Sequence, residues 1–269
     1  MNIWWTVMVI IGAVNWLAAL YILCKSFGWK KAEPQNAKYI SLLQACGIVF
    51  ASVALYRSAF VSSYPDRLAW FDVIFNSPFI VRSLAFFAEL SFIGIIAAVL
   101  LRVLKDLDIT NTMAIKTPLV AVGLIFIAQF FAYVGLVNQS QLLFFIEEFL
   151  WAAAFLIIFP LVIIGLRKIK TIDIGKSGKA FLIIMCVWCT GYLLFQLGFA
   201  LPFMYFPLIA QDAGRIVPPD ALHQSIFNYR ATRDFNEWGG IGFFIWHSGY
   251  FSVCVWMTLF FMTAPRKKG

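Results

Sequence analysis

Six ionisable side chains lie within long apolar stretches of the sequence, and they are the residues whose chemistry could give the protein a function. They are three glutamates, two arginines and a histidine: Glu89, Glu147, Glu148, Arg57, Arg82 and His247. An ionisable group inside a membrane span is costly, so it usually faces the interior of a helix bundle and marks a ligand or proton pathway. We therefore predict that these six residues form a ligand or proton site.

Glu89 gives the strongest of these signals. With a helical rise of 1.5 Å per residue, it lies about 15 Å from the outer end of its stretch, near the middle of a membrane. A carboxylate at that depth must be paired, hydrated or protonated. Arg82 lies two turns earlier, a spacing that a direct ion pair barely reaches. We therefore expect a second helix to supply the partner, from either Arg57 or His247.

Each of these signals has a simpler alternative. A protonated Glu89 can hydrogen-bond to Gln129 or Gln196 for helix packing alone. Arg57 and Arg82 lie one turn inside their stretches, where an arginine can extend outward and anchor its helix at the membrane interface. The functional alternative for both arginines is a positive rim that attracts an anionic ligand or a lipid headgroup.

Glu147 and Glu148 are adjacent, so their side chains point about 100° apart on a helix. They cannot both face the same neighbour, and we expect one to face the bundle and the other to turn toward the membrane interface. Two neighbouring carboxylates also disfavour simultaneous ionisation, which makes one of them a candidate proton carrier.

His247 can serve as a proton relay, a metal ligand, a haem ligand or a hydrogen-bonded packing residue. The chain has only two histidines, and no Glu-x-x-His spacing accompanies His247. The sequence therefore predicts no metal site, identifies no cofactor and offers no set of catalytic residues.

The six ionisable residues lie in or at the ends of seven apolar stretches of the sequence. Hydrophobic residues make up 62% of the 269 positions and charged residues 13%, whereas soluble domains carry roughly 45–50% and about 25%. Each stretch reaches the length of about 20 residues that crosses a membrane as a helix, and helices satisfy their own backbone groups there. The sequence predicts one all-α membrane domain over residues 1–269, with spans at about 3–24, 39–61, 79–101, 117–137, 142–166, 180–208 and 240–264.

The lysines indicate the orientation of this bundle. They occur only after the first, third and fifth spans and in the C-terminal tail, whereas the basic residues on the other side are all arginine. Basic residues in short loops mark the cytoplasmic side. We predict an N-terminus outside, a cytoplasmic C-terminus and a multi-pass protein of a plasma or inner membrane. The net charge of +8 then faces anionic lipid and gives no reason to expect a nucleic-acid partner.

Two segments on the predicted outer side, 62–78 and 209–239, are long enough to have structure of their own. Both mix aromatic and charged residues, which is typical of interfacial helices lying on the membrane. The alternative is a lid over a central cavity. Within 209–239 we expect a short helix that begins after Asp220 as its N-cap. Pro160, Pro202 and Pro207 should bend the fifth and sixth spans.

These observations rank several functions. The leading hypothesis is an outward-facing polar cavity that binds or passes a small solute or ion, coupled to protonation of Glu89, as in a transporter or channel. The alternatives are a receptor or sensor that signals through the basic loops, and a non-catalytic subunit of a larger membrane complex. An enzyme is the least favoured. Expected partners are the lipid bilayer and a small ligand, with homo-oligomerisation left open.

Overall fold

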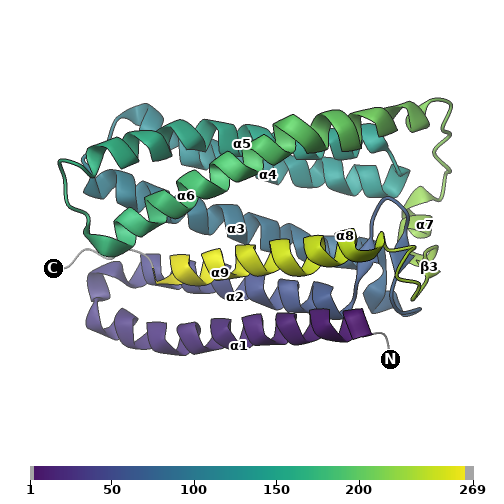
Figure 1. Ribbon diagram of the computed structural model, residues 1–269, viewed down its shortest axis with the longest axis horizontal. Helices are drawn as coiled ribbons and strands as arrows, with labels where there is room; N and C mark the ends of the chain where they lie inside the picture. The colour runs from purple at the N-terminus through teal and green to yellow at the C-terminus, as the bar shows by residue number, and fades with distance from the viewer. Residues whose placement is uncertain (1–2, 264–269) are drawn as a thin grey trace.

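The computed structural model describes residues 3–263, which form a bundle of seven helical spans (Figure 1). All seven are long and apolar enough to cross a membrane, so the predicted all-α seven-helix fold is confirmed. They cover Ile3–Ala32, Pro34–Ala59, Pro78–Asp106, Thr112–Asn138, Gln141–Lys168, Gly175–Asp212 and Gly240–Met262.

The first five spans are nearly uninterrupted helices, and the last two are composite. The single helices are α1 (Ile3–Ala32), α3 (Pro78–Asp106), α4 (Thr112–Asn138) and α5 (Gln141–Lys168), and η1 (Pro34–Asn36) precedes α2 (Ala37–Ala59). The sixth span comprises α6 (Gly175–Phe195), η3 (Gln196–Tyr205) and η4 (Phe206–Asp212). The seventh comprises α8 (Gly240–Ile245), η5 (Trp246–Tyr250) and α9 (Phe251–Met262).

Several helices extend well past the predicted spans. The first was expected to end near residue 24, but α1 continues through its lysines to Ala32. The apolar stretch measures only the hydrocarbon layer of about 30 Å, whereas a helix can continue through the polar headgroup region. The predicted loops are correspondingly shorter, and only residues 107–111 separate α3 from α4.

Consecutive helices pack side by side, and the last span closes the bundle. Each helix from α1 to α6 contacts the next along the chain, while α9 packs against α1, α2 and α3. Polar side chains join neighbours within the apolar bundle: Asn15 Nδ2 donates to Ser252 Oγ at 3.0 Å and Trp16 Nε1 to Ser52 Oγ at 3.0 Å. Such bonds hold helices together where lipid gives no hydrophobic drive for association.

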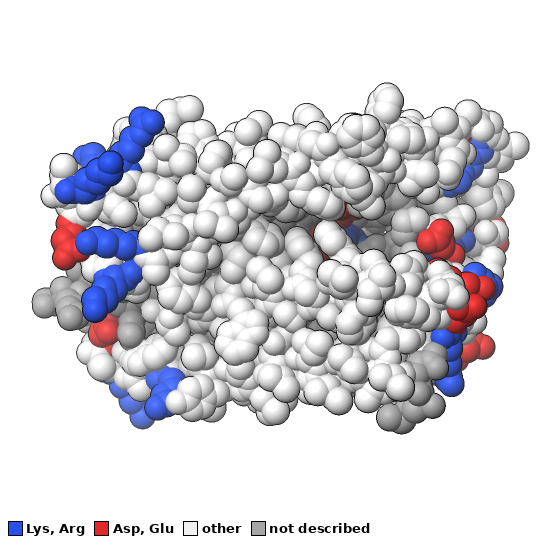
Figure 2. Space-filling view, in the orientation of Figure 1, with Lys and Arg blue, Asp and Glu red and all other residues white. Residues whose placement is uncertain are grey.

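The two ends of the bundle carry different charges (Figure 2). The end with the α1–α2, α3–α4 and α5–α6 connections, which we call the lysine end, carries every described lysine. The opposite end, the arginine end, carries Arg67, Arg215, Arg230 and Arg233 together with several carboxylates. The basic tail residues 266–268 lie outside the described residues. The orientation relative to the membrane stays a prediction from the charge rule.

Residues 62–77 and 213–239 form a structure over the arginine end, which we call the cover. It contains β1 (Ser62–Ser63), β2 (Leu68–Ala69), η2 (Ile74–Asn76), α7 (Ala221–Phe227) and β3 (Arg230–Ala231). β1 pairs antiparallel with β2, and β2 pairs parallel with β3. The two predicted outer segments therefore belong to one small sheet, although the 130 residues from 79 to 208 separate them along the chain.

The interpretation of 62–78 as an interfacial helix is wrong. Asn76, which is fully buried, holds the segment in a looped form: its Oδ1 accepts from Phe71 N and its Nδ2 donates to Val61 O, both at 2.8 Å. Pro65 also lacks the amide hydrogen that a helix interior needs. The segment lies over the centre of the bundle instead, as the lid interpretation requires.

An aromatic cluster anchors the cover to the first helix. Trp70 stacks on Trp5 with ring centroids 5.8 Å apart, and its ring meets Trp4 edge-on at 4.8 Å. Trp238, from the second segment, packs into the same cluster. The predicted helix after Asp220 is present as α7, but the Asp220 side chain accepts from Gln224 Nε2 rather than from the helix backbone.

Candidate functional site

A cavity of about 260 Å³ lies in the half of the bundle nearer the arginine end. Its walls come from α2, α3, α5, η3 and η5, and residues Ser62–Pro65 of the cover form its roof. All six residues singled out from the sequence line it: Arg57, Arg82, Glu89, Glu147, Glu148 and His247.

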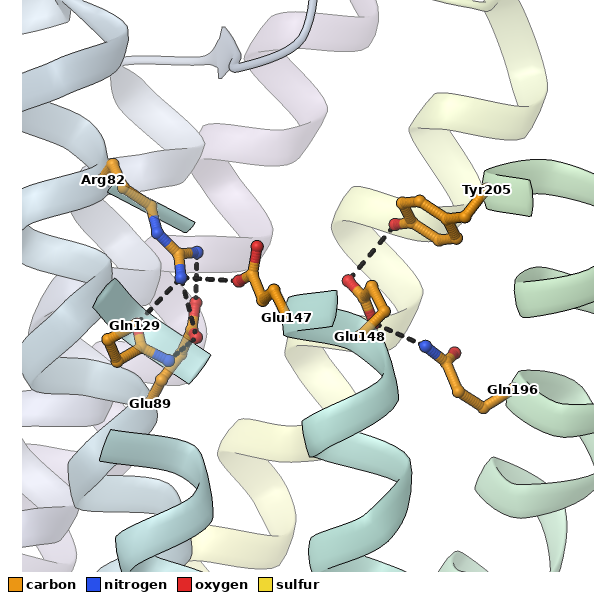
Figure 3. A network of polar contacts seen from close by, with 7 residues as sticks. All are labelled: Arg82, Glu89, Gln129, Glu147, Glu148, Gln196 and Tyr205. Carbon is orange, nitrogen blue, oxygen red and sulfur yellow. Dashed lines mark hydrogen bonds and ion pairs between the residues drawn. The ribbon is translucent and has the colours of Figure 1, made fainter. Parts of the chain in front are cut away.

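Arg82 is the centre of a buried polar network on one side of the cavity (Figure 3). Its side chain is 4% exposed, and it forms ion pairs with Glu89 at 3.0 Å and with Glu147 at 2.6 Å. Gln129 completes the network, accepting from Arg82 Nη2 and donating to Glu89 Oε2, each at 2.8 Å. Helices α3, α4 and α5 are therefore joined through one guanidinium group.

The prediction that Arg82 barely reaches Glu89, so that Arg57 or His247 must pair with it, is wrong. Positions seven apart lie on nearly the same helix face, about 10.5 Å apart along the axis, and two long side chains extended toward each other close that gap. The anchoring alternative for Arg82 is also wrong, because its guanidinium points into the bundle. The hydrogen bond predicted between Gln129 and Glu89 is present, but it accompanies an ion pair.

Glu147 and Glu148 face different neighbours, as their angular separation predicts. Glu147 points to Arg82, whereas Glu148 points the opposite way, toward η3 (Figure 3). There Gln196 Nε2 donates to Glu148 Oε2 at 2.5 Å and Tyr205 Oη donates to Glu148 Oε1 at 3.2 Å. The expectation that one carboxylate turns to the membrane interface is wrong, because α5 lies between α3 and η3 and both directions lead to a cavity wall.

Glu148 differs from the other two cavity carboxylates in its charge partners. Within residues 3–263, no cationic side chain lies within ion-pair distance of Glu148. Its hydrogen-bond donors, Gln196 and Tyr205, are both neutral. Glu148 is therefore the cavity carboxylate that can take up a proton or a cation without breaking an ion pair.

Arg57 and His247 lie together on another wall. The Arg57 guanidinium lies over the ring of Phe251, 4.4 Å from its centroid, and over Tyr64 at 5.6 Å. His247 is buried, and its Nε2 lies 3.1 Å from the Arg57 carbonyl oxygen. Since a carbonyl only accepts, Nε2 carries a proton in this contact. The ring also stacks on Phe243 at 5.4 Å.

Both composite spans contribute to the cavity through π-helical stretches. η3 supplies Gln196 and Tyr205, and η5 supplies Trp246, His247 and Tyr250. π-helical turns are rare and frequently occur at functional sites. Pro202 lies within η3 and has no amide hydrogen, and the helix is wider here than a regular α-helix. The predicted bend at Pro202 stays a prediction.

Aromatic side chains close the cavity toward the lysine end. Phe50 and Phe92 line its lower part and stack with centroids 5.2 Å apart. On α3, Phe92 lies one turn nearer the lysine end than Glu89. The rings of Phe50 and Phe92 therefore form the floor of the cavity. Below them the bundle is filled with fully buried apolar residues such as Ile96, Leu100 and Phe181. The cavity therefore does not continue as a channel.

The flank of the bundle is hollowed near the cavity. Figure 2 shows acidic and basic atoms at the bottom of a hollow that lies between the helices labelled α6 and α8 in Figure 1. Aromatic pairs bridge the two spans: the exposed pair Phe195 and Trp246 at 6.0 Å, and the half-buried pair Trp188 and Tyr250 at 5.8 Å. The roof separates the cavity from the arginine end. The hollow lies beside the cavity, on the flank of the bundle.

Reasoning from the sequence missed several cavity residues. Gln196 was considered only as a partner for Glu89, Tyr64 only as an aromatic residue of segment 62–78, and Tyr192 and Tyr205 were not considered. An amide inside an apolar span needs a polar partner, which is a usable signal for Gln196. The tyrosines give no such signal, because tyrosine is common near membrane interfaces whether or not it lines a site. Within residues 3–263, no three His, Cys, Asp or Glu side chains are grouped so that they could hold a metal ion.

No protein-family model, curated protein or solved structure matches this chain.

Proposed function

We propose that the protein binds a small solute in the cavity and carries it across the membrane in a cycle coupled to protonation. The observation that supports this most directly is Glu148, a carboxylate on the cavity wall that is held by two neutral donors and has no cationic partner in the described part of the chain. Such a group can exchange a proton for a ligand. The sequence favoured Glu89 for this role, but its ion pair with Arg82 makes Glu89 the less suitable group.

The shape of the cavity supports a carrier rather than an open pore. Phe50, Phe92 and the apolar core below them block the way to the lysine end. With the lysine end in the cytoplasm of a plasma or inner membrane, the cavity occupies the outer half, and passage requires a rearrangement of the bundle. The π-helical stretches η3 and η5 are suitable places for it, because a π turn can convert to a regular helix by shifting its hydrogen bonds.

In the proposed cycle, solute binding and protonation of Glu148 alternate. Ionised Glu148 stabilises the loaded, outward-facing state, and its protonation releases the solute after the rearrangement. The Arg82 network stays intact throughout and keeps α3, α4 and α5 together, while the spans containing η3 and η5 move against it. A ligand shifts such an equilibrium only through contacts that differ between the two states, and here these are the contacts to Glu148.

The first test is a binding screen with purified protein in nanodiscs. The probes represent four chemical classes: choline, acetate, alanine and glucose. We expect at least one class to raise the apparent melting temperature of the unaltered protein and to lose this effect in Glu148→Gln. Glu237→Gln, which removes an exposed carboxylate of the cover, serves as the matched control and should respond like the unaltered protein.

The second test measures coupling. In proteoliposomes that contain a pH-sensitive dye, adding the stabilising probe should change the internal pH, and this signal should disappear in Glu148→Gln. A probe that binds but moves no protons would contradict the carrier proposal and favour a receptor. If no probe class stabilises the protein, the cavity is not a binding site for small solutes of these kinds and the proposal fails.

A further inference from the structure

The proposed function leaves the chemical class of the solute open. The charges and the aromatic rings that line the cavity indicate this class. We infer that the solute is an organic cation, a small molecule with one ammonium group whose charge lies against Glu148 and the aromatic rings around it. This inference rests on the proposed binding role of the cavity and adds the ligand class.

The charge balance of the cavity is the first argument. Three carboxylates and two guanidinium groups line it. Arg82 is shared by Glu89 and Glu147, so the network around it carries an excess negative charge when both are ionised. Arg57 lies over Phe251 and Tyr64, away from Glu148. The α5 side of the cavity is therefore negative, and a buried negative charge needs a cation nearby.

The hydrogen bonding of Glu148 is the second argument. An ionised carboxylate offers about four acceptor positions, and in the described residues Gln196 and Tyr205 fill two of them. Both donors are neutral, so the carboxylate lacks the charge-assisted contact that would stabilise it most. An ammonium group of a ligand supplies that contact.

The aromatic lining is the third argument. Trp151 lies one turn after Glu148 on α5, and Tyr192, Trp246 and Tyr250 line the same cavity. Trp246 and Tyr250 stack with centroids 4.5 Å apart and planes 7° from parallel. Tryptophan and tyrosine faces attract organic cations through the negative potential above their rings. A carboxylate beside such rings is the combination that recognises substituted ammonium groups.

Other ligand classes fit less well. An anion would meet three carboxylates and only one guanidinium that is not already paired with them. A bare metal ion would find no group of three suitable ligands within residues 3–263. The cavity volume of about 260 Å³ is below the roughly 300–1,000 Å³ of pockets that hold drug-sized ligands, so the bound part of the solute is small.

The ammonium group can come from two sources. A water-soluble amine would have to pass the roof residues Ser62–Pro65 at the arginine end, whereas an amphiphile would approach from the bilayer through the hollow between α6 and α8 (Figure 2). The recognition chemistry at Glu148 is the same for both. Choline represents the first source, and dodecyltrimethylammonium, with the same head and a long chain, represents the second.

The test measures binding of both probes by calorimetry in nanodiscs of phosphatidylglycerol, a lipid without an ammonium headgroup, with empty nanodiscs as the blank. The neutral control is 3,3-dimethylbutan-1-ol, which has the shape of choline without its charge. We expect a cationic probe to bind at least tenfold more tightly than the neutral analogue. Glu148→Gln should weaken cation binding at least tenfold, and Trp246→Leu should weaken it several-fold.

Two variants separate loss of charge from loss of folding. Glu148→Asp keeps the charge and should retain cation binding, and Glu237→Gln should leave it unchanged. Binding of choline assigns the source to water, and binding of the amphiphile alone assigns it to the membrane; either result supports the inference. A neutral analogue that binds as tightly as choline, or a Glu148→Gln variant that binds normally, would overturn it.

Failure of the ligand class is distinguishable from failure of the proposed function. If neither cation binds while acetate or glucose, which carry no ammonium group, binds in a manner that depends on Glu148, the solute is not an organic cation and the carrier proposal stands. If none of these probes binds, both proposals fail.

Discussion

A single buried cation, Arg82, holds together carboxylates from two helices and an amide from a third. Burying charges costs several kcal/mol per ion, and this cost is offset only when each charge is paired and hydrogen-bonded. Arg82 meets this condition with Glu89, Glu147 and Gln129. The network therefore sets the positions of α3, α4 and α5 around the cavity, and it leaves Glu148 as the carboxylate free to act.

Removing the Arg82 charge should destabilise the protein strongly. Arg82→Gln leaves Glu89 and Glu147 buried without a cation, and breaking such a pair costs about 3–5 kcal/mol. We expect a clear fall in the apparent melting temperature in detergent. Arg102→Gln removes a more exposed ion pair with Asp106 near the lysine end and should have a small effect.

A compensating change provides the check on the Arg82 prediction. Adding Glu147→Gln to Arg82→Gln removes one of the two stranded charges and should restore part of the lost stability. Equal melting temperatures for Arg82→Gln and Arg102→Gln would show that the buried network does not hold the helices together.

At the scale of single helices, the stability of the bundle depends on how each helix begins and on how closely neighbouring helices pack. Helix α5, which carries Glu147 and Glu148, begins at the arginine end beside η4. Asp212 of η4 accepts from the backbone amides of Gln141 and Leu142 at 3.0 and 2.9 Å and from Ser140 Oγ at 2.7 Å. A carboxylate at this position satisfies free amides and interacts favourably with the helix dipole.

Asp212→Ala should loosen the first turn of α5. Losing a capping side chain costs about 0.5–2 kcal/mol, and hydrogen exchange of the amides from Gln141 to Phe145 should become faster. Asp220→Ala is the matched control. Asp220 occupies the N-cap position of α7, but its side chain makes no hydrogen bond to the helix backbone. Unchanged exchange in Asp212→Ala would show that η4 does not stabilise the start of α5.

Gly47 allows α2 and α9 to approach closely. A methyl group at this position would lie 2.1 Å from Met262 Sδ. Gly47→Ala should therefore force the two helices apart or displace Met262, at a cost of about 1–3 kcal/mol, seen as a lower apparent melting temperature. Gly123→Ala in α4 meets no atom within 4 Å and should be neutral or slightly stabilising, because alanine favours a helix by about 1 kcal/mol over glycine. A neutral Gly47→Ala would contradict the close packing of α2 on α9.

At the scale of the whole molecule, the charges are distributed asymmetrically. The lysine end carries basic connections (Figure 2) above a largely apolar interior. The arginine half encloses the polar cavity beneath the cover. Because the cavity lies in the half nearer the arginine end, the orientation of the chain decides which side of the membrane the cavity is nearer to. The charge rule predicts that the lysine end is cytoplasmic.

Labelling with a membrane-impermeant maleimide tests the orientation in a cysteine-free version of the chain. Ile216→Cys places a thiol at an 88% exposed position at the arginine end, and Asp173→Cys places one in the exposed α5–α6 connection at the lysine end. We expect Ile216→Cys to react in intact cells and Asp173→Cys to react only after permeabilisation. The reverse pattern would place the cavity on the cytoplasmic side and would contradict the predicted orientation.

The seven spans and the charges within them were predictable from the sequence, because crossing a membrane imposes a local requirement on length and polarity that each stretch meets alone. The sequence did not determine how those charges pair. Arg82 reaches Glu89 and Glu147, Glu148 finds Gln196 and Tyr205, and residues 62–63, 68–69 and 230–231 form one sheet, because helices and segments far apart in the chain lie side by side. Such pairings depend on lateral packing and side-chain extension, which no periodicity along the chain records. The tertiary structure was needed to show that, among residues 3–263, Glu148 rather than Glu89 is the cavity carboxylate with no cation within ion-pair distance.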